Sequence, residues 1–177
     1  MRPQSWTLLK VVAAVVLVGV AAGFAAARFR QFRQTGEEGA TVWFYDQSAK
    51  RLYEAPRQSI PAQAGVGGRG EGGVRAVVVC FRGEQADPHK RRIAYLETYA
   101  PALRELLERA QAARASGHVL GQRIPPRDSA FFQTNDLVKR PEESGWHAAS
   151  SPEGQKIMAE WRSWRAPGGQ TPVVCLP

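Results

Sequence analysis

The sequence predicts an α+β protein, with one N-terminal transmembrane helix followed by a small antiparallel sheet covered by two helices. An uncharged apolar run, short β-branched and aromatic segments between Gly- and Pro-rich connections, and two later segments of helical periodicity support this prediction. We therefore divide the chain into a tail and anchor over residues 1–33, a linker over 34–40, and an α+β domain over 41–177.

The N-terminal segment has the length and the flanks of a membrane span. Val11–Ala27 contains 17 residues without a charge. With the apolar residues from Trp6 onward, the segment spans roughly 33 Å as a helix, close to the hydrocarbon core of a bilayer. Lys10 can extend its ammonium group to the interface, where aromatic side chains also gather. The expected membrane-interface residues are Trp6, Lys10, Arg28, Arg30 and Arg33.

The same segment also fits a cleavable secretory signal, since it starts with a charge and ends on the small residues Ala25-Ala26-Ala27. The apolar run exceeds the usual length of a signal, and the arginines that follow it disfavour processing. We therefore expect a retained anchor. A buried core helix is the third alternative, and the lack of a polar face at any helical period argues against it.

Charge balance and cysteine use bear on compartment and partners. Residues 1–33 hold five of the basic groups behind the net charge of +8, so residues 34–177 carry 19 basic and 16 acidic groups. This near-neutral balance gives little affinity for phosphate backbones. The expected partners are the lipid bilayer and other envelope proteins, with no nucleic acid; a DNA-uptake accessory is the alternative that salt-dependent binding would reveal.

Orientation rests on two arguments, because the basic groups on the two sides of the span are equal in number: Arg2, Lys10 and the amino terminus against Arg28, Arg30 and Arg33. A domain of this size translocates largely regardless of flanking charge, and two cysteines within apolar strands suit an oxidising compartment. We expect a single-pass protein of the bacterial inner membrane with a periplasmic C-terminal domain.

The domain begins with a predicted hairpin over 41–54, in which Thr41–Tyr45 and Arg51–Glu54 are the strands. Val74–Arg82 is apolar on both faces and is predicted to be a central strand. The Gly-rich run over 65–73 lacks the Gly-Lys-Ser/Thr ending of a phosphate loop and precedes a strand instead of a helix, so we expect a loop there and no cofactor.

The second half of the domain contains the two expected helices. Arg92–Thr98 is a strand or the entry to a helix, and the first helix begins at Pro101 and ends at Gly117. Its apolar face comprises Leu103, Leu106, Leu107 and Ala110. Ala130–Gln133 is predicted to be a strand. Ser151 caps the second helix, on which Ile157, Trp161 and Trp164 share a face, and Val173–Leu176 is a terminal strand.

The two cysteines, Cys80 and Cys175, are candidates for a disulfide that would join the central and terminal strands. Two separately buried thiols are the alternative. A catalytic cysteine has less support, because no CxxC motif is present and apolar surroundings raise a thiol pKa.

The sequence contains no HExxH or GxSxG motif and no Cys/His pair at metal-ligand spacing. We predict no catalytic, cofactor-binding or metal-binding residue, and expect a membrane-anchored envelope protein of binding or scaffolding type. The alternative is an envelope enzyme of hydrolase or thiol type. Such an enzyme would act through Cys80 or through a pair drawn from His89, His118, His147, Asp87, Asp128 and Asp136. Trp146, Trp161 and Trp164 are expected to pack in the core.

Several short motifs follow the anchor: Phe44-Tyr45-Asp46, Lys50-Arg51-Leu52-Tyr53, Ala55-Pro56, Ile60-Pro61, a Gly-rich loop before Val74-Arg75-Ala76, and Ser151-Pro152-Glu153-Gly154. In this combination the chain resembles a group of small uncharacterised bacterial membrane-anchored proteins. The resemblance implies location and domain extent and no catalytic residue. The layout is also similar to that of pilins, but the N-terminus MRPQSWTLL lacks their cleavage site and their early Glu.

Overall fold

The computed structural model describes residues 40–177 except 69, 71, 119–120, 122 and 167. The chain divides after Ala40 into two units, and the second, Thr41–Pro177, carries the elements described below. The predicted membrane helix and its interface residues lie outside the described residues. Among the residues that are described, no helix combines the length and hydropathy needed to cross a bilayer.

The domain opens with the predicted hairpin. Strands β1 (Thr41–Asp46) and β2 (Arg51–Pro56) pair antiparallel, from Thr41 opposite Pro56 to Asp46 opposite Arg51. Phe44 has no exposed surface, and its ring centroid lies 5.8 Å from that of Tyr53, its cross-strand partner. This aromatic pair on the hairpin face stabilises the register.

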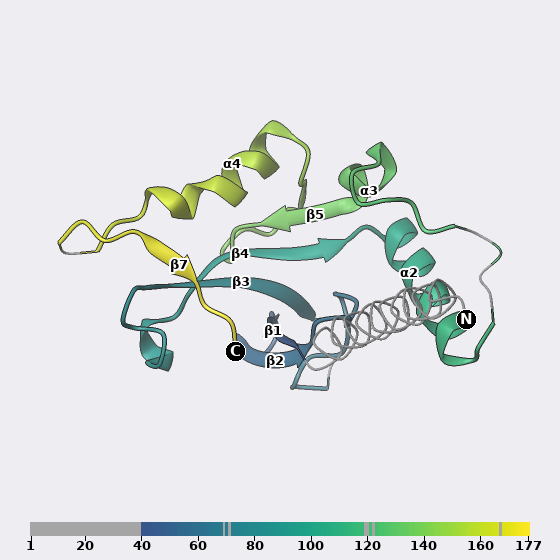
Figure 1. Ribbon diagram of the computed structural model, residues 1–177, viewed down its shortest axis with the longest axis horizontal. Helices are drawn as coiled ribbons and strands as arrows, with labels where there is room; N and C mark the ends of the chain where they lie inside the picture. Colours follow the sequence, from purple (N-terminus) through teal and green to yellow (C-terminus); the bar gives the residue numbers. More distant parts are fainter. Residues whose placement is uncertain (1–39, 69, 71, 119–120, 122, 167) are drawn as a thin grey trace, which may run out of the picture. The chain divides into compact units, whose positions relative to one another are not determined.

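Strand β3 (Gly73–Phe81) is central, as predicted, and most of its side chains are buried. One edge of β3 pairs with β4 (Arg92–Tyr99). The other edge is divided: Gly73–Arg75 pairs with β1, and Val79–Phe81 pairs with β7 (Pro172–Val174). Figure 1 shows β3 alongside β4, with the short terminal strand β7 near one end of β3.

The segment over 92–98 is a strand, which decides between the two alternatives that its sequence allows. A short 3₁₀ helix, η1 (Pro88–Lys90), precedes it, and α2 (Pro101–Ala115) follows. Leu103, Leu106 and Ala110 are buried on α2, as the periodicity predicted, while Leu107 is only half-buried. Pro101 begins α2 because its fixed φ and missing N–H suit a first turn.

The predicted strand at Ala130–Gln133 is wrong: this segment begins a short helix, α3 (Ala130–Asn135). The Ser129 Oγ accepts a hydrogen bond from the Phe132 N–H at 3.2 Å and so caps the helix. A short apolar run fits a strand or a helix equally well, and here the cap decides between them. The strands that follow were not predicted: β5 (Asp136–Lys139) and β6 (His147–Ala148).

The second predicted helix is present as α4 (Pro152–Glu160), with Ser151 as its cap. A 3₁₀ turn, η2 (Trp161–Ser163), ends it, so Trp161 and Trp164 lie beyond the α-helix and are half-buried. Gly154 lies against the carbonyl of Ala148, where any Cβ would collide. The glycine of the Ser-Pro-Glu-Gly motif therefore has a packing role between α4 and β6.

Arg140 joins α4 to the segment after β5. Its guanidinium lies 2.6 Å from Glu143, 3.1 Å from Glu153 and 2.7 Å from Glu160, counted between nitrogen and carboxylate oxygen. These contacts raise the pKa of Arg140, with the hydrogen bond that it donates to Glu160 as the largest cause, and lower the pKa of Glu143, which accepts hydrogen bonds from Arg140. One cation thus holds carboxylates from three positions in the chain.

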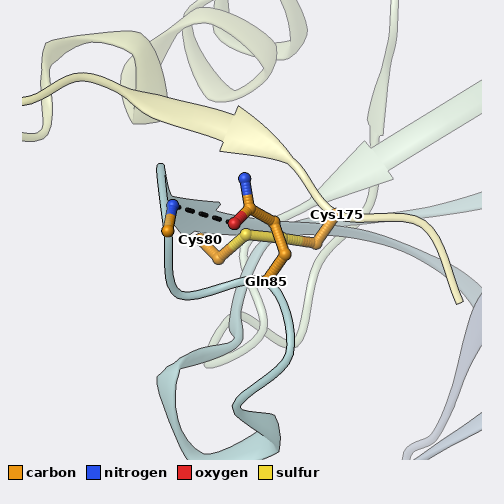
Figure 2. Close-up of a disulfide and its surroundings, with 4 residues drawn as sticks. Cys80, Gln85 and Cys175 are labelled. Carbon is orange, nitrogen blue, oxygen red and sulfur yellow. Dashed lines mark hydrogen bonds between the residues drawn. A yellow bond between two sulfur atoms is a disulfide. The ribbon is translucent and has the colours of Figure 1, made fainter.

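Of the two alternatives that the sequence left open for the cysteines, the structure has the disulfide. Cys80 on β3 and Cys175 just after β7 are joined by a disulfide, with their Cα atoms 6.0 Å apart, and both are buried. The Cys175 N–H donates a hydrogen bond to the Val78 carbonyl at 2.8 Å. Figure 2 shows the disulfide together with Gln85, which lies in the loop between β3 and β4. The Gln85 carboxamide oxygen accepts a hydrogen bond from the Gly83 N–H at 2.8 Å.

The sheet order is β2-β1-β3-β4-β5-β6, with β7 beside β3, and all strand pairs among the described residues are antiparallel. The predicted α+β class with an antiparallel sheet is confirmed, although the described residues hold three α-helices where two were expected. Along β4, Ala94, Leu96 and Thr98 are buried on one face. The opposite face carries Tyr95, Glu97 and Tyr99, which are half-buried.

Candidate functional site: an arginine-lined cavity

The floor of the candidate site is a pair of charged residues in the middle of the sheet. Arg75 on β3 and Glu97 on β4 are register partners, and their side chains approach to 3.9 Å. The Arg75 Nη2 also donates long hydrogen bonds to the carbonyls of Arg57 (3.4 Å) and Ser59 (3.3 Å). The Arg75 Nε is buried and has no partner among the described residues. The Arg75 guanidinium therefore has an N–H group that can still donate a hydrogen bond.

A cavity of about 320 Å³ opens beside Arg75. Its walls come from the segment after β2, from the end of β4, from one stripe of α2, and from the segment that leads into α3. The lining residues are Arg57, Gln58, Ser59, Ile60, Arg75, Tyr99, Leu107, Ala110, Gln111, Arg114, Ile124, Pro125, Arg127 and Phe132. The volume lies at the small end of the range of ligand sites, about 300–1,000 Å³.

The cavity lining includes four arginines and no Asp or Glu. Arg75 has Glu97 as its neighbour, whereas Arg57, Arg114 and Arg127 form no ion pair within the part of the chain that the structure describes. Guanidinium groups present a fork of donors that matches carboxylates, sulfates and phosphates. The arrangement is therefore suited to an anion.

Two acidic side chains lie near the arginines of the cavity: Glu97 beside Arg75, and Asp136 within the electrostatic influence of Arg127. Burial raises the pKa of Glu97, opposed by the charge of Arg75, and burial likewise raises the pKa of Asp136, opposed by Arg127. Burial and the nearby charge of Glu97 raise the pKa of Tyr95 to about 12. For both carboxyl groups, burial disfavours the charged form and the neighbouring arginine favours it.

A second cavity, of about 300 Å³, adjoins the first. Two residues, Arg127 and Phe132, line both. The Arg127 guanidinium lies 5.8 Å from the centre of the Phe132 ring, and Phe132 in turn packs edge-on against Tyr99. The Ser129 cap of α3 holds the backbone of Phe132, and the Phe132 ring packs against Arg127, which lines both cavities. The other lining residues of the second cavity are Gln133, Asp136, Ala149, Ser150 and Gln155.

Three of the residues considered for an enzyme, the histidines, lie apart from the cavities. His89 lies exposed on η1, and His118 lies exposed after α2, with its Nδ1 3.0 Å from the Ser116 Oγ. His147 on β6 is 3.8 Å from Glu143. No group of three metal-ligating side chains occurs within the described residues.

The candidate aspartates are likewise dispersed, and only one contributes to a cavity. Asp87 caps η1 by accepting a hydrogen bond from the His89 N–H at 2.9 Å, and Asp128 is exposed. Asp136 begins β5 and lines the second cavity. Cys80 is bonded to Cys175, which leaves neither as a nucleophile. The structure therefore does not assemble the pairs that an enzyme of hydrolase or thiol type would use.

The arginines of the cavity were not singled out from the sequence, because they lie at scattered positions without a motif. Two signals were nevertheless present. Arg75 interrupts an otherwise apolar strand, and Arg114 continues the helical stripe of Leu107 and Ala110 at the next turn. A charge inside an apolar strand, or one that continues the apolar stripe of a helix, indicates a functional or structural role for that charge.

Comparisons of the chain with protein-family models, with curated proteins and with solved structures found no match.

Proposed function

We propose that the chain is a membrane-anchored envelope protein of binding type whose domain over 41–177 binds an anionic ligand in the arginine-lined cavity. The observation that carries the proposal is the set of Arg57, Arg75, Arg114 and Arg127 around one cavity without an acidic lining residue. Like charges gathered at a surface are costly unless a counter-charge is bound, and a bound anion removes that cost.

The character of the walls favours binding over catalysis. The lining of the first cavity includes no His, Cys, Asp or Glu, so it offers no conventional general base. Its hydroxyl groups are those of Ser59 and Tyr99, and neither has a base among the lining residues. An envelope enzyme, the alternative from sequence, would need such a base at the cavity.

The anion site is tested by titrating the full chain, purified in detergent, with citrate in a calorimeter. Arg114→Gln removes one guanidinium from the cavity wall, and Arg109→Gln is the matched control on the same helix, outside the lining. We expect Arg114→Gln to weaken citrate binding at least about tenfold, because hydrogen bonds to charged groups carry that much discrimination. Equal binding by wild type and Arg114→Gln would contradict the proposal.

The compartment is part of the proposal and has its own experiment. The apolar run over 11–27 supports an anchor, and the disulfide is of the kind that persists in oxidising compartments. Alkaline phosphatase fused after Pro177 should be active if the domain is periplasmic. An inactive phosphatase fusion with a fluorescent GFP fusion would reverse the orientation, and a carbonate wash of the membranes separates a retained anchor from a cleaved signal.

A further inference from the structure

The second cavity has a different chemistry from the first. Apart from the shared Arg127 and Phe132, its lining offers two carboxamides, a hydroxyl and a single carboxyl group. The Gln133 side chain has no hydrogen-bond partner among the described residues, and neither has the Asp136 carboxyl group. The Gln133 carboxamide and the Asp136 carboxyl group can therefore form hydrogen bonds with a ligand in the second cavity.

The Asp136 carboxyl group limits what can occupy the second cavity. A ligand that carries negative charge along its whole length would bring an anion against the Asp136 carboxyl group, and like charges repel. A neutral hydroxyl group, in contrast, donates to this carboxyl and accepts from a Gln carboxamide. The second cavity therefore suits a neutral, hydroxyl-rich group.

The two cavities meet at Arg127, so one ligand can occupy both. From these observations we propose that the ligand is an acidic oligosaccharide, with a uronic acid carboxylate among the arginines of the first cavity and an adjoining neutral sugar in the second. This inference rests on the proposed anion binding and deepens it. The apolar side chains of Leu107 and Ile124 in the first cavity provide a surface for the C–H face of a sugar ring.

The sheet and helix positions explain how this division arises. Gln133 lies on α3 and Asp136 begins β5 directly after it, while Gln155 on α4 is anchored by a hydrogen bond from its Nε2 to the Ala149 carbonyl at 2.7 Å. The basic residues come instead from the segment after β2, from β3, from α2 and from the segment before α3. Charged and neutral groups are therefore presented by different elements, which separates the acidic and neutral ends of the ligand.

The test compares three ligands by calorimetry with the full chain: glucuronate, a disaccharide of glucuronate linked to a neutral sugar, and a neutral disaccharide. We expect the acidic disaccharide to bind about 10-fold more tightly than glucuronate, and the neutral disaccharide not to bind. Gln133→Ala should weaken the acidic disaccharide about 2- to 10-fold and leave glucuronate unchanged. Gln47→Ala, outside both cavities, is the matched control.

The outcomes separate this inference from the anion site itself. Arg114→Gln should weaken both acidic ligands. If citrate and glucuronate bind while the added sugar and Gln133→Ala change nothing, the saccharide assignment is overturned and the anion site stands. A triglutamate peptide that binds more tightly than the acidic disaccharide also overturns it, in favour of an acidic peptide. If no anion binds, both proposals fail.

Discussion

Asp46 and Gly67, 21 residues apart, are joined by a hydrogen bond of 3.0 Å from the Gly67 N–H to the Asp46 Oδ2. The other carboxylate oxygen accepts from the Ser48 N–H, the Ser48 hydroxyl and the Ala49 N–H, at 2.9, 2.6 and 3.0 Å. Asp46 has no exposed surface. The carboxylate therefore ties the hairpin turn to the Gly-rich segment, which gives that segment a structural role.

This arrangement predicts a loss of stability in acid. The hydrogen bonds, the one from the Ser48 hydroxyl first, hold the pKa of Asp46 well below its ordinary value of 3.8. A carboxyl group whose pKa is lower in the folded state stabilises the fold above its ordinary pKa, and this stabilisation is lost as pH falls through the folded-state pKa. We expect Asp46→Asn to lower the melting temperature at pH 7 and to flatten its decline below about pH 4.

The control for Asp46→Asn is Asp128→Asn, which changes an exposed carboxylate. Both variants are compared with the wild type by thermal denaturation across pH 2–7. Parallel pH profiles for wild type and Asp46→Asn would show that the buried hydrogen bonds of Asp46 are not a source of acid lability.

Gly65 is expected to be intolerant of any side chain, because a Cβ at this position would collide with the Asp46 carboxylate. Gly65→Ala should therefore destabilise the domain by about 1–3 kcal/mol, the usual cost of overpacking. Gly145→Ala is the matched control, since a Cβ there meets nothing within 4 Å. Denaturant unfolding measures the stability of both variants. Equal unfolding midpoints for Gly65→Ala and Gly145→Ala would contradict the close approach of Gly65 to the Asp46 carboxylate.

The elements that the sequence predicted correctly are those with a local physical signal. The apolar residues of β3 indicated a central strand, and the periodicity of Leu103, Leu106 and Ala110 identified α2. Ser151 placed the start of α4. Each of these signals lies within a single segment: its pattern of apolar and polar residues, or its capping residue. Such a segment can therefore be assigned without knowledge of the rest of the chain.

The cavity could not be predicted in the same way, because its residues converge only in three dimensions. Arg57, Arg75, Arg114 and Arg127 come from four separate segments. Because Ala130–Gln133 was predicted to be a strand, α3 was not predicted, and the position of Phe132 in the lining of both cavities could not be inferred. The short strand β5 was missed because its four residues, Asp136–Lys139, show no clear alternation of polar and apolar side chains.

Arg140 should contribute more to stability than an ordinary exposed arginine, since it holds Glu143, Glu153 and Glu160 together. Arg140→Gln leaves these carboxylates to repel one another and loosens the contact between α4 and β5. Arg109→Gln, which breaks one exposed pair with Glu105, should change the unfolding free energy by no more than about 0.5 kcal/mol. Denaturant unfolding at low and high salt checks the difference, and a loss for Arg140→Gln no larger than that of the control would contradict the role of the cluster.

The last prediction concerns the disulfide between Cys80 and Cys175, which closes a sequence separation of 95 residues. The bond joins the central strand to the chain end, and such a link restricts the unfolded chain by about 2–4 kcal/mol in the chain-entropy description. Cys175→Ser should lower the melting temperature under oxidising conditions, and reductant should lower that of the wild type by a similar amount while leaving Cys175→Ser unchanged. Mass spectrometry after alkylation checks the bond itself: the unfolded wild type should take up iodoacetamide only after reduction. Labelling of both cysteines without reductant would show free thiols, and would also weaken the argument for a periplasmic domain, because the bond is what favours an oxidising compartment.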